Sequence, residues 1–352
     1  MKLFTVGPVE MYESTLNQRK EQIPYFRTKE FSNIMLQCQE KFLSLAKAPK
    51  ESKLAVLTAS GTGAMETAVM NALNPNDKVL VINGGSFGKR FSELCDVHSI
   101  EHHDILVPFG KALTYKDLQP FESQDFTALL VNAHETSTGQ LYDLNMLGDF
   151  CQRNNLIFIV DAVSAFLVDK IDMEQMHIDL LLTASQKALS LAPGLSFIVV
   201  NKRMYDVIEN NECVCKYFDL KDYFLNMERG QTPYTPAVGI VYELYDRLNQ
   251  ICAIGIDEIN KQHQHRAEYF RKECDKIGLK YGQYPLSNGV TPLIFENGKA
   301  YDYFLDAKDH YDLMLTPNGG PLSETVLRIG HMGNLTKEDY DLVINYFKEV
   351  LA

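Results

Sequence analysis

The stretch 156–187, LIFIVDAVSAFLVDKIDMEQMHIDLLLTASQK, decides the fold of this chain. It contains two almost wholly apolar runs, Leu156–Val163 and Leu180–Thr183, and such runs are typical of strands that are buried on both faces. Polar residues end each run, namely Asp161 and Ser164 in the first and Ser185 and Lys187 in the second. Because ligands of open α/β sheets bind just outside the carboxyl ends of the strands, we expect a binding site at these residues.

An acid and an amine that come from separate strand ends suit one particular cofactor. A carboxylate such as Asp161 keeps a neighbouring pyridine nitrogen protonated, and a lysine of lowered pKa such as Lys187 can form a Schiff base. Pyridoxal phosphate needs this pair of groups. Each residue alone is more often structural, because charged side chains are mostly capping groups or solvated. The interpretation therefore also requires a phosphate site.

A candidate phosphate site follows the short apolar run Leu54–Leu57. The next residues, 58–66, read TASGTGAME, and an apolar helical pattern follows them. A strand, a turn of small residues and a helix together direct free backbone N–H groups and a positive dipole end toward an anion. The turn is neither a Walker A motif nor GxGxxG. The alternative is a capped βα turn whose small residues allow close packing.

Two further strand ends carry polar or glycine-rich segments. Residues 83–90, NGGSFGKR, follow the run Lys78–Ile82, and Phe87 offers a face on which a flat ligand could stack, unless it only begins the apolar face of a helix. The run Ala128–Val131 leads to residues 132–139, NAHETSTG. His134 alone is a weak signal, since an isolated histidine at a strand end is more often structural.

The alternation of apolar runs and helical segments from 54 to 200 predicts an α/β fold with a mostly parallel, mixed sheet and helices on both faces. Leu195–Val200 should close the sheet as an antiparallel or edge-proximal strand. We expect a large domain, residues 1–255, and a small C-terminal α+β domain, residues 256–352. A helix expected over Phe31–Lys47 should pack against another subunit or the small domain, and the chain should be irregular from 203 until it becomes helical after Pro236.

Composition narrows the range of partners. With a formal net charge of −12 over 352 residues, the chain has no basic surface for nucleic acid or an anionic membrane. No apolar segment has signal-peptide or membrane-spanning length, so we expect a cytoplasmic protein whose partners are small molecules. The seven cysteines should be reduced and mostly buried, and their spacing predicts no metal site.

Six motifs occur in order along nearly the whole chain: SGTGAME, GSFGKR, HETSTG, VDAVSAF, SQK and LRIGHMG. In this order and spacing the chain resembles the class V pyridoxal-phosphate-dependent aminotransferases of fold type I, whose fold is like that of aspartate aminotransferase. The likeness is strongest to the branch that contains alanine/serine–glyoxylate and 2-aminoethylphosphonate–pyruvate aminotransferases.

The resemblance implies a role for each matching residue. Lys187 would form the Schiff base, Asp161 would pair with the pyridine nitrogen, and Phe87 would stack on the ring, where relatives often have Trp. The phosphate would be held by Thr62 and Gly63, with Ser185 or Gln186. Thr136 would lie near the 3-oxygen of the ring, and Arg328 would bind the substrate carboxylate. Thr235, in the segment GQTPYTP, would reach the phosphate of the neighbouring subunit, which implies a homodimer with shared active sites.

The implied activity is transfer of an amino group from 2-aminoethylphosphonate, alanine or serine to pyruvate or glyoxylate. The sequence does not decide among these substrates, and it assigns no role to His102, His103 or His331. The nearest rival is a class V lyase such as a cysteine desulfurase. That enzyme needs a reactive cysteine on a mobile loop in its last third, whereas the last cysteine of this chain, Cys274, lies on an expected helix.

Overall fold

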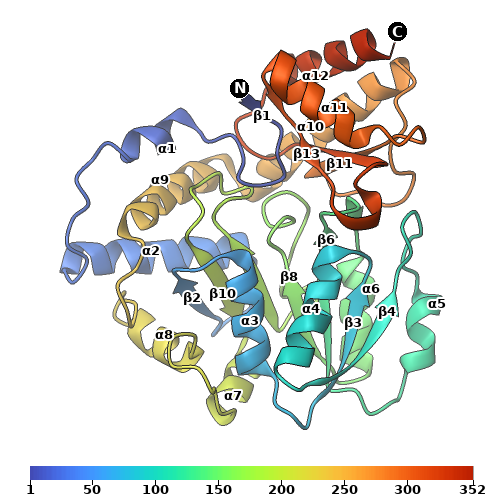
Figure 1. Cartoon of the computed structure of the whole chain (residues 1–352). Coiled ribbons are helices and arrows are strands. Elements are labelled where there is room, and N and C mark those ends of the chain that lie inside the picture. Colours follow the sequence, from blue (N-terminus) through green and yellow to red (C-terminus); the bar gives the residue numbers. More distant parts are fainter. Residues whose placement is uncertain (352) are drawn as a thin grey trace.

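The computed structural model describes residues 1–351, and a seven-stranded mixed sheet forms the centre of its larger part (Figure 1). The strand order is β2-β10-β9-β8-β5-β3-β4. Only β10 is antiparallel to its neighbours, and the other pairings are parallel. In chain order the strands are β2 (Lys53–Leu57), β3 (Lys78–Asn83), β4 (Glu101–Leu106), β5 (Ala128–Asn132), β8 (Ile157–Asp161), β9 (Leu180–Ala184) and β10 (Ser196–Val200).

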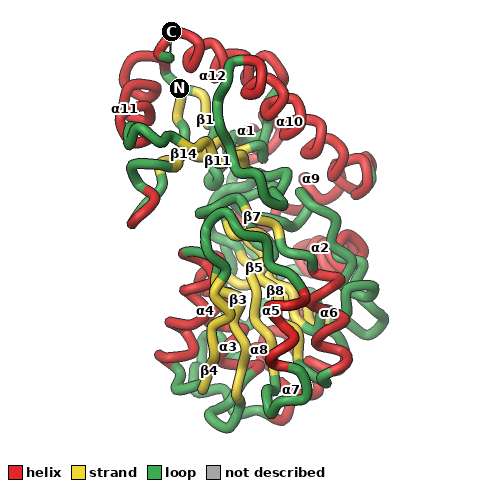
Figure 2. Tube along the Cα trace, turned by 90° about the vertical axis from the view of Figure 1, so that its right-hand side faces the viewer, coloured by secondary structure: helices red, strands yellow, loops and turns green. Residues whose placement is uncertain are grey.

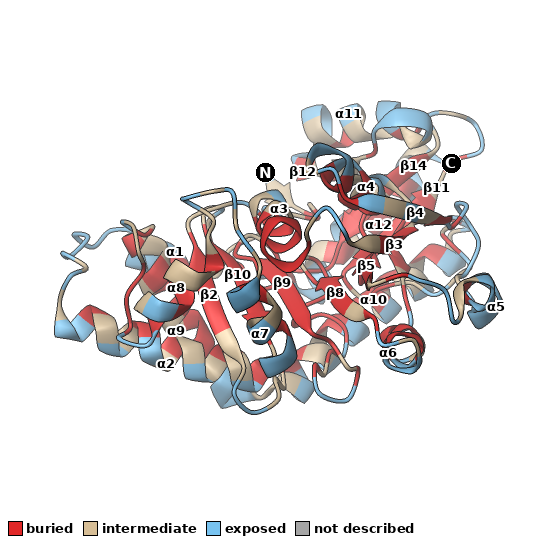
Figure 3. Ribbon diagram, turned by 90° about the horizontal axis from the view of Figure 1, so that it is seen from below, coloured by how far each residue is buried: buried red, intermediate tan, exposed pale blue. Residues whose placement is uncertain are grey.

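Helices cover both faces of this sheet (Figure 2). One layer contains α3 (Gly61–Ala72), α4 (Ser86–Val97) and α8 (Leu220–Met227), and the other contains α2 (Lys29–Leu45), α6 (Leu144–Arg153) and α9 (Val238–Ile254). Alternate residues of a strand enter opposite layers, as Leu54 packs with α2 while Ala55 packs with α3. All the strands of this sheet except the edge strand β4 are consequently buried on both faces (Figure 3), which explains their continuous apolar runs.

The smaller part is an α+β unit with its own core. Its antiparallel sheet has the order β11-β14-β13, with β11 (Val290–Ile294), β13 (Thr316–Pro317) and β14 (Val326–Gly330). Helices α10 (Ile256–Lys276), α11 (Ala300–Tyr311) and α12 (Lys337–Val350) cover it. The start of the chain joins this unit, because β1 (Lys2–Leu3) pairs in parallel with β12 (Leu313–Met314). The division of the chain at residue 255 stays a prediction.

A short hairpin links the two parts. It consists of β6 (His134–Glu135) and β7 (Gln140–Leu141) and lies beyond the carboxyl end of β5. Leu141 N donates a hydrogen bond to Pro285 O, and Ser287 N donates one to Gly139 O. The carboxyl ends of the parallel strands therefore face the small domain across this hairpin. None of the described helices is both long and apolar enough to cross a membrane.

Most of the expected elements are confirmed, including the antiparallel β10 strand and the helix after Pro236. The irregular segment expected from 203 is wrong, since α7 (Lys202–Asn210) and α8 lie there. Asn201 caps α7 by accepting a hydrogen bond from Met204 N at 2.8 Å. Packing of α2 on the small domain is also wrong, because α2 lies on α9 and the large sheet, whereas its packing against another subunit stays a prediction. The edge strand β4, with His102 and His103, has little apolar periodicity and was not expected.

Candidate active site

Asp161 is the last residue of β8 and is buried. Its Oδ1 atom accepts a hydrogen bond from Val163 N at 2.8 Å, and Oδ2 has no hydrogen-bond partner among residues 1–351. Burial raises the pKa of this carboxyl from 3.8 to about 6, although the hydrogen bond from Val163 and the charge of Lys187 oppose the rise. A buried carboxylate with a free oxygen is suited to a cationic N–H partner.

Lys187 follows β9 by three residues and is 9% exposed. Its Nζ donates a hydrogen bond to Val6 O at 2.6 Å. Burial, together with the charge of Arg328, lowers the pKa of the ammonium from 10.5 to about 8, and Asp161 partly offsets this effect. The amine is therefore much closer to its nucleophilic, neutral form at physiological pH than an exposed lysine would be.

The N-terminus of α3 presents free backbone donors. Ser60 caps the helix by accepting a hydrogen bond from Gly63 N at 3.2 Å. Within residues 1–351 the N–H groups of Gly61 and Thr62 have no acceptor. A side chain at Gly61 would place Cβ 3.0 Å from Val163, so this end of the helix packs closely on the loop that follows Asp161. An anion could bind here.

The N-terminus of α4 is closed by the protein itself. The buried carboxylate of Glu135 accepts hydrogen bonds from Phe87 N at 3.1 Å and from Gly88 N at 3.0 Å. Phe87 is only partly buried, and the guanidinium carbon of Arg90 lies 4.6 Å from its ring centroid. Arg90 also donates a hydrogen bond to Thr62 Oγ1 at 3.1 Å. Of the two helix N-termini, α3 alone keeps donors for an external anion.

Ser185 and Gln186, the two candidate phosphate ligands between β9 and Lys187, differ in whether their side chains are already hydrogen-bonded within the protein. Ser185 Oγ donates to Ala192 O at 2.5 Å and accepts from Leu195 N at 3.2 Å, so its only hydrogen is engaged. Gln186 Oε1 is buried and has no partner among residues 1–351. A buried amide without a partner is costly unless a ligand or water satisfies it.

Arg328, on β14, reaches from the small domain toward the hairpin. It donates to Thr136 O at 3.1 Å and to Pro317 O at 2.7 Å. Burial lowers its pKa from 12.5 to about 10. Within residues 1–351 it forms no ion pair with a carboxylate, and its Nε has no partner. Thr136 is itself buried and shares a hydrogen bond of 3.0 Å with Ser164.

Other residues singled out in the sequence lie elsewhere. Thr235 is exposed. His331 is buried behind β14, where it shares a hydrogen bond of 2.8 Å with Thr291, and His103 packs against Phe121 at the sheet edge. Cys274 is buried in α10, and burial raises the pKa of its thiol. A buried thiol of raised pKa does not suit the desulfurase alternative.

Three contributors were not foreseen from the sequence: Val6, Arg90 and Glu135. Arg90 and Glu135 lie inside motifs GSFGKR and HETSTG, so their motifs were the signal that could have found them. Val6 acts through its backbone carbonyl, which no side-chain pattern marks.

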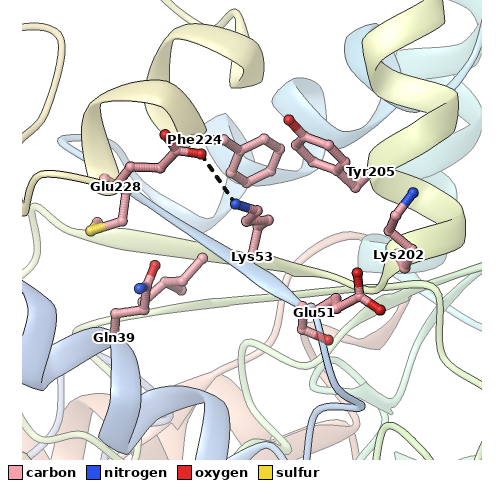
Figure 4. A pocket seen from close by; sticks show the side chains of 10 residues that line it. Gln39, Glu51, Lys53, Lys202, Tyr205, Phe224 and Glu228 are labelled. Carbon is pink, nitrogen blue, oxygen red and sulfur yellow. Dashed lines mark hydrogen bonds and ion pairs between the residues drawn. The ribbon is translucent and has the colours of Figure 1, made fainter.

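The opposite edge of the sheet provides a contrast. A pocket of about 380 Å³ lies at the start of β2, where Lys53 and Glu228 form an ion pair of 3.3 Å (Figure 4). Lys202 and Tyr205 also line it, and both Lys53 and Glu228 are substantially exposed. This is the amino end of the parallel strands, and it has no paired buried acid and amine. The buried acid Asp161 and the buried amine Lys187 both lie at the carboxyl ends of the parallel strands.

Comparison with known proteins decides the family. The profile of the aminotransferase class-V family matches residues 10–303. The chain is a class V aminotransferase. An uncharacterised aminotransferase of Methanocaldococcus jannaschii is 30% identical over 94% of this chain and 87% of its own length. Alanine–glyoxylate aminotransferase of Mus musculus is 30% identical over 84% of this chain and 74% of its own. The crystal structure of a subgroup IV aspartate aminotransferase from Thermus thermophilus covers 100% of this chain and 99% of its own, with a TM-score of 0.92 and 25% identity.

Class V aminotransferases depend on pyridoxal 5′-phosphate, and the site of this aminotransferase fits that cofactor. The buried residue Asp161 has an oxygen without a hydrogen-bond partner among residues 1–351, and the carboxamide oxygen of Gln186 is buried without a partner there. The N-terminus of α3 has two unused N–H groups beside them. A pyridinium N–H would satisfy the free Asp161 oxygen, and a phosphate would accept from the two free N–H groups of α3.

Proposed function

We propose that this aminotransferase moves an amino group from a small amine or amino acid, namely alanine, serine or 2-aminoethylphosphonate, to pyruvate or glyoxylate. The observation that carries the proposal is Arg328, a guanidinium without a carboxylate partner among residues 1–351 whose charge reaches Lys187. A half-buried guanidinium is held in place by two backbone carbonyls and still has N–H groups to offer. Such a group suits a substrate carboxylate through a two-point contact.

The proposed cofactor contacts follow from the free groups of the site. Asp161 would pair with the pyridine nitrogen, Phe87 would stack on the ring, and Thr136 would lie near its 3-oxygen. We assign the phosphate to the α3 N-terminus, at the free N–H groups of Gly61 and Thr62, and to the amide N–H groups of Gln186. The Gly63 N–H, which the resemblance implied as a ligand, is donated to Ser60 Oγ. Ser185 would act indirectly, since its hydroxyl hydrogen is donated to Ala192 O. When bound, the cofactor supplies an electron sink for the electrons left on the donor carbon.

The residues of the chain would supply binding and proton transfer. Arg328 would fix the carboxylate so that the Cα–H bond points at Lys187. The Nζ atom of Lys187, neutral in part near pH 7, would take the Cα proton and later deliver it as a general acid. The same groups would act in the reverse order on the 2-oxo acid. The same buried amine, Lys187, would thus accept and deliver the transferred proton in both half-reactions.

The amino donor can be identified by half-reactions. The cofactor-loaded protein is mixed with alanine, serine, aspartate or 2-aminoethylphosphonate without an acceptor, and its visible spectrum is recorded. The proposal predicts that one of the small donors converts the cofactor to its aminated form and that pyruvate or glyoxylate restores it. Aspartate is included because the Thermus relative is named for it. No conversion by the three proposed donors would refute the substrate assignment.

We also propose a homodimer in which Thr235 reaches the phosphate site of the partner. The segment that contains Thr235 is held rigidly, because Arg27 donates to Gln231 Oε1 at 3.0 Å and to Thr232 O at 2.9 Å. Thr235 itself is exposed, beside a groove of about 800 Å³ that residues 18–24 and 235–243 line. Ile23, which lines this groove, and the nearby Tyr25 are 58% and 68% exposed, as expected of apolar residues at a subunit interface.

Analytical ultracentrifugation tests the dimer. The native chain should sediment at twice the monomer mass. Ile23→Glu should shift it toward the monomer and lower cofactor affinity, whereas the control substitution Leu342→Glu, at an exposed aliphatic residue elsewhere, should do neither. A native monomer that binds the cofactor tightly would contradict the shared site.

A further inference from the structure

The first residues of the chain form a strap, residues 4–8, that is fixed to the small domain. Phe4 N donates a hydrogen bond to Met314 O at 2.9 Å, and Phe4 O accepts one from Gly330 N at 2.7 Å. Val6 N donates to Thr316 Oγ1 at 3.1 Å. Three successive contacts therefore join the strap to the strands that also carry Arg328.

The strap also contacts the large domain, at its most reactive side chain. Val6 O accepts the hydrogen bond from Lys187 Nζ, at 2.6 Å. Next to it, Gly7 has a φ of +135°, and a Cβ built on it would lie 2.6 Å from Cδ, 2.8 Å from Cε and 2.7 Å from Nζ of Lys187. Real Cβ contacts are never this short, so the lysine occupies the space that any side chain at residue 7 would need.

We propose that the Val6 carbonyl and the bare Cα of Gly7 form a seat that positions the Lys187 amine, which makes the strap a positioning element for the transamination step. This inference rests on the proposed function. A neutral amine that gives one N–H to Val6 O has its lone pair directed elsewhere, away from the strap. Because the strap is hydrogen-bonded to β13 and β14, the seat and the Arg328 guanidinium are held by the same small sheet.

A purely local role for Gly7 is the competing explanation, because a positive φ by itself favours glycine. Gly255 separates the two explanations. It has a φ of +91°, and a Cβ built on it has no atom within 4 Å. Gly255→Ala therefore imposes backbone strain without any contact to Lys187, and it is the matched control for Gly7→Ala.

The test measures covalent capture and reversible binding separately. The rate at which cofactor-stripped protein captures pyridoxal phosphate is followed by absorbance and confirmed by borohydride trapping. Reversible affinity is measured by equilibrium dialysis in a Lys187→Ala background, where the clash at residue 7 is absent. We expect Gly7→Ala to slow capture at least tenfold in the native background and to change affinity less than twofold in the Lys187→Ala background. Gly255→Ala should change neither more than twofold.

Two results would overturn the proposal: capture by Gly7→Ala at the native rate, or an equal loss of affinity in the Lys187→Ala background, which would mean a general structural defect. Thr316→Val provides a second variant that adds no atom near the lysine. It frees Val6 N and should slow capture about threefold to tenfold, and an unchanged rate would count against the seat.

Failure of the native protein to bind the cofactor at all would contradict the proposed function rather than the seat. The seat is then tested by labelling Lys187 with trinitrobenzenesulfonate in the cofactor-free protein. Gly7→Ala should change the labelling rate at pH 8 at least fivefold relative to Gly255→Ala. Equal rates would refute the contact.

Discussion

The lowered pKa of Lys187 gives a prediction about the protein without its cofactor. With a pKa of about 8 instead of 10.5, the neutral amine at pH 7 rises from roughly 3 in 10,000 to about 1 in 10 molecules. The neutral fraction is therefore about 300-fold larger. Since only the neutral amine attacks electrophiles, Lys187 should begin to react with a labelling reagent at a lower pH than an exposed lysine, although its burial limits the access of the reagent.

Competitive labelling over pH 6–11, read by mass spectrometry of the Lys187 peptide, measures this midpoint. The exposed Lys89 in the same chain serves as an internal reference for the reagent. We expect a midpoint of about 8 for Lys187. Arg328→Gln should raise the midpoint, because Arg328 is the second cause of the shift after burial, and Arg153→Gln on the exposed surface should not. A native midpoint at or above 10 would refute the reasoning about the buried amine.

Three further predictions concern the neighbours of Lys187. In the cofactor-free protein, a folded-state pKa of about 6 for Asp161 against an ordinary 3.8 means that ionising the buried acid destabilises the fold progressively as pH rises from 4 to 6, by about 3 kcal/mol in all. Asp161→Asn should therefore gain about that much stability relative to the native chain between pH 4 and pH 7 in urea titrations; a difference that does not vary with pH would be inconsistent with the buried acid. Arg328→Lys should lower kcat/KM for the 2-oxo acid by about 30-fold to 1,000-fold, about 2–4 kcal/mol, because the two-point contact is lost. The control is Arg266→Lys, since Arg266 contacts only backbone carbonyls of the small domain, and this substitution should leave kcat/KM unchanged. Steady-state kinetics with pyruvate and glyoxylate measure both, and equal effects of the two substitutions would show that Arg328 does not bind the substrate. Glu135→Gln should destabilise the protein by about 1–3 kcal/mol in urea, because the buried cap of α4 loses an acceptor, and the partly exposed Glu66→Gln should cost much less; equal losses would argue against the cap.

The sequence predicted those parts of the fold that depend on local pattern. The buried strands β8 and β9 have continuous apolar runs, and their polar ends marked Asp161 and Lys187 directly. The helix α7 was missed although the sequence carries its signal, because Met204 and Ile208 lie four positions apart on one buried face and Asn201 is a capping residue. The placement of α2 on the small domain was wrong because periodicity identifies an apolar face but does not say what that face contacts.

The site was predictable where side chains supply the chemistry and unpredictable where the backbone does. Asp161, Lys187 and Arg328 stand out by type and position. The Val6 carbonyl and the missing Cβ of Gly7 have no such signature, because they depend on residues 181 and 180 positions away in the chain. The engagement of Ser185 by Ala192 likewise follows from a local turn that a motif does not describe.

Reductive trapping tests the central claim, that Lys187 and Asp161 form the cofactor site, most directly. The protein is loaded with pyridoxal phosphate, reduced with borohydride and digested, and the modified peptide is sequenced by mass spectrometry. We expect one phosphopyridoxyl group per chain, on Lys187, and a strongly reduced yield in Asp161→Ala at equal protein concentration. Modification of another lysine, or of none, would contradict it.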